Sequence, residues 1–215
     1  MNETLVVFPS RQEFNILFPK ISAVVASSTP VPVDGRFDVA VCGVGLVNSA
    51  AGMSRFLSTG NYRKVFLLGI CGAYLNRDLD IGEVVRVDSE VVGDMGAQNS
   101  DGHFIPWRDI SKQNEIFVGE TTRYLPLMLA SVRSVVGVSV NCCTGTSYLS
   151  LKRSALFDAD VESMEGASVF AICKAFRVPV FEFRAISNIA TDRDPSQWKI
   201  AEAMIALKHR VLDYL

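Results

Sequence analysis

The sequence predicts an α/β fold in which strands alternate with helices and the sheet is covered on both faces. Short apolar runs such as residues 65–68 and 180–186 are bounded by glycine or polar residues, as buried strands are. Longer stretches between such runs, such as residues 48–57 and 164–176, have apolar residues at helical spacing. Alternation of the two types predicts helices on both sides of one sheet.

The elements follow in order along the chain. Pro9 and Ser10 interrupt the first strand and precede the first helix. We predict strands at 5–8, 39–42, 65–68, 83–92, 135–140 and 180–186, and helices at 11–17, 48–57 and 164–176. A final helix is expected from Asp194 as N-cap, with Pro195 at N1 and Gln197 at N3, to near the C-terminus. Residues 94–114 are polar and rich in turn residues, and predict a surface loop.

Composition limits what the chain does. Its 215 residues, 49% of them hydrophobic, fit one domain spanning 1–215. The net charge of −2 offers no basic excess for a phosphate backbone, so nucleic acid is not an expected partner. The apolar runs are far shorter than the roughly 20 residues of a membrane span. Acidic Glu3 before the first run argues against a signal peptide, so we expect a cytoplasmic protein.

Metal, redox and triad chemistry find little support. The five cysteines lie in apolar surroundings without a C-x-x-C motif, and we expect buried, reduced thiols. The adjacent pair Cys142 and Cys143 leaves a redox role open. The two histidines, His103 and His209, lie far apart in the sequence, which gives a zinc site little support. We therefore expect no metal, no cofactor and no Ser-His-Asp triad.

Polar residues follow several apolar strands, where ligands of α/β sheets bind. The segments are 9–13, 69–72, 163–166 and 187–188. Taken alone, Glu165 could serve only the helix dipole, Asn188 could be a turn residue and Glu13 could be a solvated helix residue. Gly43 and Gly45 do not make a dinucleotide fingerprint, because Asn48 stands where the third glycine belongs.

Taken together, these segments resemble the nucleoside phosphorylase/nucleosidase superfamily. Residues 161–170 (VESMEGASVF) are similar to the family's acidic ribose-binding helix start, and 183–188 (FRAISN) to its base-binding strand end. Residues 43–50 are similar to its early strand-turn-helix, and 69–73 with 79–85 to its central glycine-rich turn and the following strand. The motifs keep the family's order along nearly the whole chain.

The resemblance implies a three-layer αβα sandwich around a mixed, partly closed sheet, in a homodimer or higher homo-oligomer. Within the family, the likeness is greatest to the nucleosidases that cleave futalosine, in an alternative menaquinone pathway. Three features carry it: Asn188 after Arg184-Ala185-Ile186-Ser187, the stretch 192–198, and the turn 94–97 followed by 102–104. The implied partner is a small nucleoside.

The family's site residues carry over by position. Glu165 matches the glutamate that accepts both ribose hydroxyls, and Met164 the residue against the ribose. Glu13 lies where related nucleosidases have the water-activating glutamate. Substrate contacts are also implied for Cys71, Gly72, Tyr148 and Ser187.

Asn188 departs from the aspartate of adenine-specific members. Its carbonyl can accept from N7–H while its amide donates to a 6-oxo group, which fits hypoxanthine rather than adenine. We expect residues 94–114 to close part of the pocket, with Phe104 and Trp107 as apolar contacts. Arg108 or Arg193 is expected to meet the substrate carboxylate.

Other activities remain open at this point. Phosphorolysis is disfavoured because Ile70 stands where a hydroxyl residue would hold phosphate, although nucleosidases also usually have serine there. An aminofutalosine- or methylthioadenosine/S-adenosylhomocysteine-type nucleosidase is a second alternative. A non-catalytic nucleoside-binding protein is disfavoured by the presence of both Glu13 and Glu165.

Overall fold

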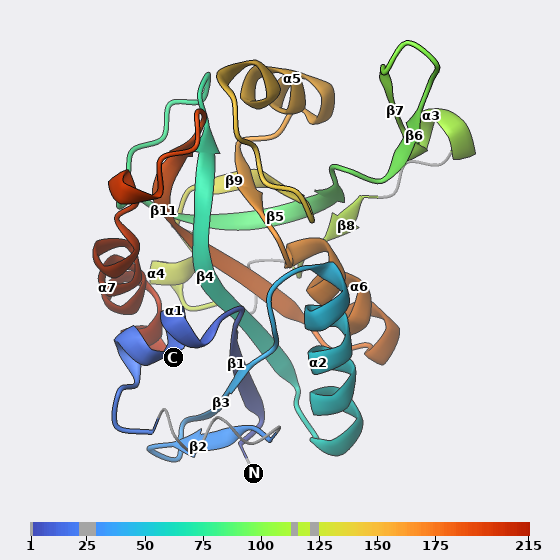
Figure 1. Cartoon of the computed structure of the whole chain (residues 1–215). Coiled ribbons are helices and arrows are strands. Elements are labelled where there is room, and N and C mark those ends of the chain that lie inside the picture. The colour runs from blue at the N-terminus through green and yellow to red at the C-terminus, as the bar shows by residue number, and fades with distance from the viewer. Residues whose placement is uncertain (1, 22–28, 113–115, 121–124) are drawn as a thin grey trace.

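One large mixed sheet with helices on both faces dominates the computed structural model, which describes residues 2–21, 29–112, 116–120 and 125–215 (Figure 1). The strands of this sheet are β1 (Thr4–Phe8), β2 (Val31–Val33), β3 (Phe37–Val41), β4 (Lys64–Tyr74), β5 (Val84–Val92), β8 (Phe117–Val118), β9 (Ser134–Ser139), β10 (Val161–Ser163) and β11 (Val180–Ala190). The helices are α1 (Arg11–Leu17), α2 (Leu46–Thr59), α3 (Trp107–Ser111), α4 (Leu127–Ala130), α5 (Ser147–Phe157), α6 (Gly166–Phe176) and α7 (Ile200–Arg210).

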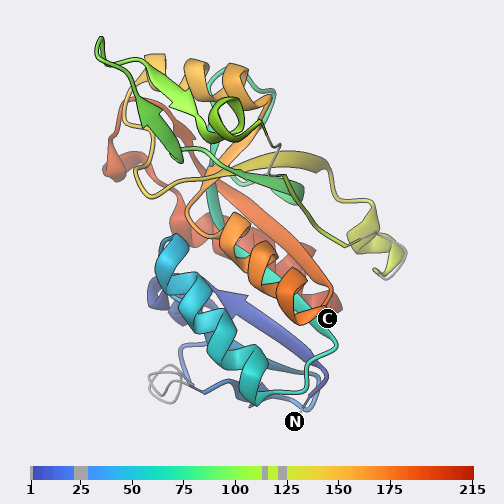
Figure 2. The ribbon, with the colours of Figure 1, turned by 90° about the vertical axis from the view of Figure 1, so that its right-hand side faces the viewer.

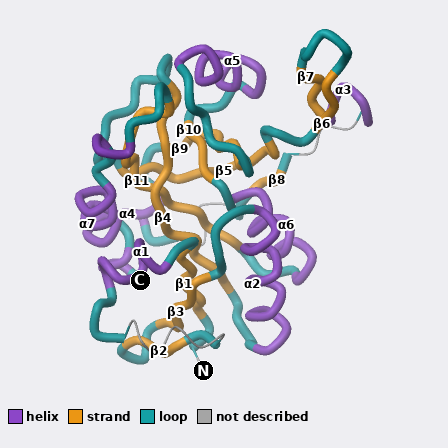
Figure 3. Tube along the Cα trace, viewed as in Figure 1, coloured by secondary structure: helices purple, strands orange, loops and turns teal. Residues whose placement is uncertain are grey.

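The sheet is partly closed, as predicted. Its strand order is β10-β9-β5-β11-β4-β1-β3-β2, and β10 pairs again with β4. Strand β4 makes this closure possible because it is long: its first half pairs with β1 in parallel, and Gly72 and Ala73 pair with β10 in antiparallel register. The tube in Figure 3 shows β4 running through both the open and the closed part of the sheet.

Alternating side chains of β1 build the core on both sides of the open part of the sheet. Val6 and Phe8 are in the cluster under α1 and α7, while Leu5 and Val7 are in the cluster under α2 and α6. Figure 2 shows α2 and α6 lying side by side over one face. The three-layer αβα arrangement is therefore confirmed. Among the described residues, no helix is long and apolar enough to cross a membrane.

Two strands run further than the sequence predicts. The predicted strands ended at residues 68 and 186, but β4 continues to Tyr74 and β11 to Ala190. Residues 69–72, expected as a turn, are paired with β11, and a register shift falls between Ile186 and Asn188. Closure of the sheet supplies these residues with partner strands, so their backbone groups are paired despite the glycines.

The chain after β11 also differs from the prediction. Asp194 caps only a short 3-10 turn, Pro195–Gln197, by accepting from the backbone N of Ser196 at 3.1 Å. The final helix α7 then begins at Ile200. Strand β10 and helix α5 were not predicted, because both are short or weakly amphipathic in sequence.

Residues 94–114 form more structure than a loop. They contain the hairpin of β6 (Gly96–Gln98) and β7 (Phe104–Pro106), followed by α3, and residues 113 and 114 lie outside the described residues. Figure 1 shows this hairpin projecting from the body of the molecule.

The expectation of uniformly buried thiols is wrong in part. Cys42, Cys71 and Cys173 are buried, whereas Cys142 is exposed and Cys143 half-buried, because these two follow β9 in a loop.

Candidate active site

A cavity of about 320 Å³ lies where β1 and β10 end. The long strands β4 and β11 pass beside it and contribute residues from their middle and second halves. Seven of the eight predicted site residues line it: Glu13, Cys71, Gly72, Met164, Glu165, Ser187 and Asn188. They come from segments far apart in the sequence, and the folded sheet brings them together. The volume is in the range of small-molecule sites.

Glu13 is positioned by the start of α1. Ser10 is the N-cap and Glu13 the N3 residue of a capping box, in which each side chain bonds the backbone N of the other. The second oxygen of Glu13, Oε1, accepts from the backbone N of Ile70 at 2.9 Å. The carboxyl group is 4% exposed and lines the cavity. It is therefore held rigidly between α1 and β4.

The environment of Glu13 raises the pKa of its carboxyl. Burial raises the pKa of the carboxyl, and the charge of Glu165 adds to the rise. Hydrogen bonds from Ser10 and Ile70 and the charge of Arg184 offset part of it. A carboxyl whose pKa is raised toward the working pH is suited to accepting a proton from water.

Glu165 lies at the N-cap of α6 rather than in the first turn, where it was predicted. Its Oε1 accepts from the backbone N of Gly45 at 3.2 Å, and its Oε2 accepts from Arg184 at 3.3 Å. Gly45 has a φ of +84°, a conformation that favours glycine, and this turn aims its N–H at the carboxylate. Glu165 is thus fixed from two sides at the cavity wall.

Arg184 connects Glu165 to a further buried glutamate, Glu182, and sequence reasoning did not select it. Its Nε donates to Glu182 at 2.7 Å, one terminal nitrogen donates to the carbonyl of Ile70 at 3.2 Å, and the other donates to Glu165. Although burial disfavours its charge, the carboxylates of Glu182, Glu165 and Glu13 raise its pKa. The sequence did contain a signal for Arg184, which is a charged residue inside the predicted buried strand 180–186. A buried arginine requires charged or polar partners, so its position indicates a site.

Glycine at position 69 is a steric requirement of this arrangement. A Cβ there would lie 2.7 Å from a terminal nitrogen of Arg184 and 2.8 Å from Oε1 of Glu13. Neither group has room to move, since both are buried and hydrogen-bonded. The glycine of β4 therefore lets the arginine and the glutamate approach the strand.

Asn188 follows the register shift in β11, and its side-chain amide makes half of the hydrogen bonds that it can form. Its Oδ1 accepts from Ser187 Oγ at 2.8 Å, and its Nδ2 donates to the carbonyl of Ile189 at 3.1 Å. An amide oxygen accepts two hydrogen bonds and an amide nitrogen donates two. One acceptor and one donor position of Asn188 are therefore left for a ligand in the cavity.

Cys71 is not a nucleophile in this arrangement. Burial raises the pKa of its thiol, so the thiolate is disfavoured at neutral pH. Its backbone carbonyl lies 3.3 Å from Ser187 Oγ and is the alternative acceptor to Asn188 Oδ1 for the single hydroxyl proton. Met164 lines the wall between Ser163 and Glu165.

The structure does not bring Tyr148 to the other predicted residues. Its side chain is 73% exposed at the start of α5 and does not line the cavity. The opposite face of α5, carrying Ser150, Arg153 and Ser154, is the buried one. Helix periodicity therefore turns Tyr148 outward within this chain.

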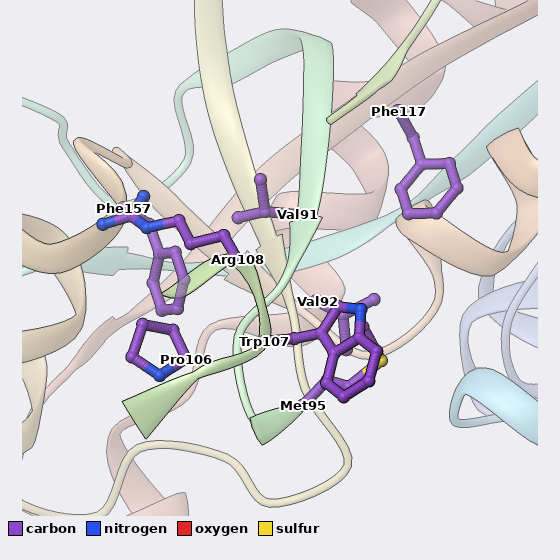
Figure 4. Close-up of a pocket in the computed structure, with 8 residues that line it drawn as sticks. All are labelled: Val91, Val92, Met95, Pro106, Trp107, Arg108, Phe117 and Phe157. Atoms are coloured by element: carbon purple, nitrogen blue, oxygen red, sulfur yellow. The ribbon is translucent and has the colours of Figure 1, made fainter. Parts of the chain in front are cut away.

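Residues 94–112, the described part of the segment 94–114, do not line the cavity within one chain, contrary to the expectation. Trp107 and Arg108 line a separate cavity of about 30 Å³, together with Val91, Val92, Met95, Pro106, Phe117 and Phe157 (Figure 4). Arg108 donates to the carbonyl of Leu156 at 2.6 Å. Of the two arginines considered for a carboxylate, only Arg193 lines the large cavity, where it stacks on Trp198 with 4.9 Å to the ring centroid.

A buried hydrogen-bond network around Glu162 supports another part of the cavity wall, and the sequence did not predict it. Glu162 accepts from the backbone N of Thr144 at 2.7 Å and from Arg153 at 2.8 Å. Tyr74 donates to the same carboxylate at 3.2 Å. Thr144 and Glu162 line the cavity, so this network fixes the loop after β9 against it. Within the described part of the chain, no group of His, Cys, Asp or Glu is arranged to hold a metal ion.

The arrangement offers three chemical functions in one cavity. Glu13 can take a proton, Glu165 can accept from hydroxyl groups and oppose a positive charge, and Asn188 can pair with one donor and one acceptor. These are the groups that cleavage of a bond between a sugar and a heterocycle requires.

Comparisons with known proteins agree with this geometry. The family model described as the phosphorylase superfamily matches residues 34–213. Futalosine hydrolase of Thermus thermophilus is 30% identical over 178 residues, which cover 79% of this chain and 76% of the relative. Futalosine hydrolase of Streptomyces coelicolor is 30% identical over 188 residues, covering 81% and 77%. Aminodeoxyfutalosine nucleosidase of Campylobacter jejuni is 28% identical over 161 residues, covering 70% and 66%.

Solved structures share the fold. A futalosine hydrolase mutant of Helicobacter pylori superposes with a TM-score of 0.74 at 19% identity, covering 99% of this chain and 100% of that one. The 5′-methylthioadenosine/S-adenosylhomocysteine nucleosidase of the same organism gives a TM-score of 0.74 at 18% identity, covering 99% of each chain.

Proposed function

The chain belongs to the phosphorylase superfamily, and we propose that it is a nucleosidase that hydrolyses the N-glycosidic bond of futalosine. The products are hypoxanthine and dehypoxanthine futalosine, in menaquinone biosynthesis by the futalosine route. The observation that carries the proposal is the meeting of Glu13, Glu165 and Asn188 in one cavity.

The reaction passes through an oxocarbenium-like ribose, while the departing purine builds up negative charge and takes a proton at N7 from solvent water. Glu165 accepts from the ribose hydroxyls and opposes the positive charge of the sugar. Glu13 takes the proton of the attacking water, which its raised pKa favours. Met164 lies against the ribose.

Asn188 selects the base. Its spare acceptor pairs with N7–H of hypoxanthine and its spare donor with O6, while Ser187 and Ile189 hold the amide plane. Adenine would place its amino donor against the amide donor. This favours futalosine over aminofutalosine and methylthioadenosine.

Arg193 is the candidate for the carboxylate at the far end of the substrate. It lines the cavity, and an arginine fork matches a carboxylate well. Stacking on Trp198 limits the motion of its guanidinium, so it loses less freedom when it binds.

Phosphorolysis is the nearest competing activity, and the cavity disfavours it. Among the described lining residues the guanidinium groups are those of Arg184 and Arg193. Arg184 is already engaged by Glu182 and Glu165. The backbone N of Ile70 donates to Glu13, and its apolar side chain cannot donate to phosphate.

We further propose that residues 1–215 act as one catalytic domain in the cytoplasm, as a homodimer or higher homo-oligomer, without nucleic acid as a partner. The even balance of charge and the cavity sized for a small molecule support this.

The test is a comparison of futalosine, aminofutalosine, inosine and methylthioadenosine, each with and without phosphate, with the free base quantified by chromatography. We expect hypoxanthine from futalosine at a rate independent of phosphate, and the highest kcat/KM for that substrate. A requirement for phosphate would assign a phosphorylase instead, and binding without turnover would assign a binding protein.

A further inference from the structure

Two glutamates lie behind the cavity wall without lining it. Glu90 on β5 and Glu182 on β11 are both fully buried, and their strands are antiparallel neighbours. Each has one partnered oxygen. Glu182 Oε1 accepts from Nε of Arg184 at 2.7 Å, and Glu90 Oε2 accepts from Ser139 Oγ at 2.8 Å.

The other two oxygens both lie beside Gly166 and have no hydrogen-bond partner among the described residues. They are Oε1 of Glu90 and Oε2 of Glu182. A Cβ at Gly166 would lie 2.3 Å from the first and 2.7 Å from the second, and a Cβ at Gly137 would lie 2.3 Å from the first. Glycines thus make room for two carboxyl oxygens that no N–H or O–H of the described residues reaches.

Two carboxylates cannot both stay ionised in such a place, because burial and mutual repulsion both disfavour the second charge. A proton between the two free oxygens would satisfy both at once. We propose that Glu90 and Glu182 share one proton, with Glu90 as the acid and Glu182 as the carboxylate, and that this pair positions Arg184 against Glu165.

The surrounding charges assign the proton to Glu90. Burial raises the pKa of both groups, and for Glu90 the charge of Glu182 adds to this most. Arg184 stands against Glu182 directly and so stabilises its charge. In the part of the chain that the structure describes, Glu90 has a hydrogen bond from the neutral hydroxyl of Ser139 instead. Arg184 and Glu165 act on Glu90 from a greater distance, with opposite signs.

The pair matters because it fixes the arginine at its Nε. With Nε on Glu182, the two terminal nitrogens of Arg184 point to the carbonyl of Ile70 and to Glu165. Glu182 is therefore a positioning residue that acts on the ribose-binding glutamate through Arg184. This role rests on the proposed function, whereas the shared proton is independent of any substrate.

Infrared difference spectroscopy of the whole protein at neutral pH tests the proton. We expect the C=O stretch of a buried protonated carboxyl in the native chain, its loss in Glu90→Gln, a change of its frequency in Glu182→Gln, where the hydrogen-bond acceptor changes, and an unchanged band in the control Glu202→Gln, an exposed acid on α7. In Glu90→Gln the amide oxygen accepts from Ser139 and the amide nitrogen donates to Glu182. Absence of the band in the native protein, or its survival in Glu90→Gln, would overturn the proposal.

Kinetics and NMR test the positioning role. Glu182→Gln should lower kcat by about ten- to a hundredfold with a smaller change in KM, because Arg184 loses its charged partner. The conservative Glu90→Gln keeps the Glu182 carboxylate and should retain most of kcat. The Nε–H resonance of Arg184 should shift in Glu182→Gln and stay nearly unchanged in Glu90→Gln. Equal effects of the two variants on this resonance would contradict the asymmetry.

Thermal melts give a check that needs no substrate. Because the folded chain holds the Glu90 proton more tightly than the unfolded chain does, this group stabilises the fold at low pH, and the contribution is lost as pH rises through its raised pKa. Tm should therefore fall less with rising pH in Glu90→Gln than in the native protein. If the native protein shows the band but does not cleave futalosine, the proton pair stands and the proposed function fails.

Discussion

At the scale of single residues, Glu165 carries the largest expected contribution to rate. Glu165→Gln removes the charge that opposes the developing positive charge of the ribose, while the N–H of Gly45 keeps an acceptor. We expect kcat/KM to fall by roughly a hundredfold or more, about 3 kcal/mol, with the fold retained. Steady-state kinetics with circular dichroism measures this, with Glu202→Gln as the control. Near-normal kcat/KM would show that Glu165 does not bind the ribose.

Glu13→Gln separates catalysis from binding. A general base acts on the water and not on ground-state affinity, so hydrolysis should be abolished while a slow substrate analogue still binds. Calorimetry and turnover are measured on the same preparation. Binding with full turnover would refute the assignment.

Asn188→Asp tests how the base is recognised. A carboxylate would face O6 of hypoxanthine, so activity on futalosine should fall, and the ratio of kcat/KM for futalosine over aminofutalosine should drop by ten- to a hundredfold, since an unpaired buried polar group costs roughly 1–3 kcal/mol. The ratio is obtained from both substrates with both proteins. If it is unchanged, another residue reads the base.

At the scale of elements, the start of α1 sets the proton affinity of the base. The Ser10 side chain donates to Glu13 and lowers the pKa that burial raises. Ser10→Ala removes this donor, so the pKa of Glu13 should rise further. Because the base works only when ionised, kcat/KM falls as pH drops through that pKa, and the acid limb of the profile should move to higher pH.

The matched control is another N-cap. Thr146→Ala removes the side-chain acceptor of Leu149 N at the start of α5, outside the cavity. Both variants should lose about 1 kcal/mol of stability, seen in denaturant unfolding. Only Ser10→Ala should move the acid limb, and a shift in both would mean that stability rather than Glu13 controls the profile.

At the scale of the whole molecule, the projecting hairpin is expected to meet a second copy. Trp107 and Ile110 on α3 are 39% and 43% exposed next to the small apolar cavity. Exposed apolar patches of this kind mark interfaces. Sedimentation should give a dimer or higher oligomer for the native chain and a monomer for Trp107→Asp with Ile110→Asp. Leu127→Asp on α4, also exposed, should leave the assembly unchanged.

Much of the open part of the sheet was predictable from local pattern. Helix 11–17 has the predicted bounds because Ser10 and Glu13 form a capping box, a signal confined to four residues. The closed part of the sheet was not predictable in this way. The extension of β4 through Gly69 and of β11 through Asn188 depends on pairing with strands that are distant in the sequence. Local pattern treats such glycines as turns.

For the site, the sequence by itself identified the residue types and their order, because Glu13, Glu165 and Asn188 follow elements whose ends carry polar residues. The folded chain was needed to place Tyr148 and residues 94–112 away from the cavity and to show that Arg184 links Glu165 to Glu182. It alone brought Glu90 and Glu182 together, since a buried charge is decided by its neighbours in space. Sequence periodicity reports which face of an element is buried, but partners across strands are set by the closure of the sheet.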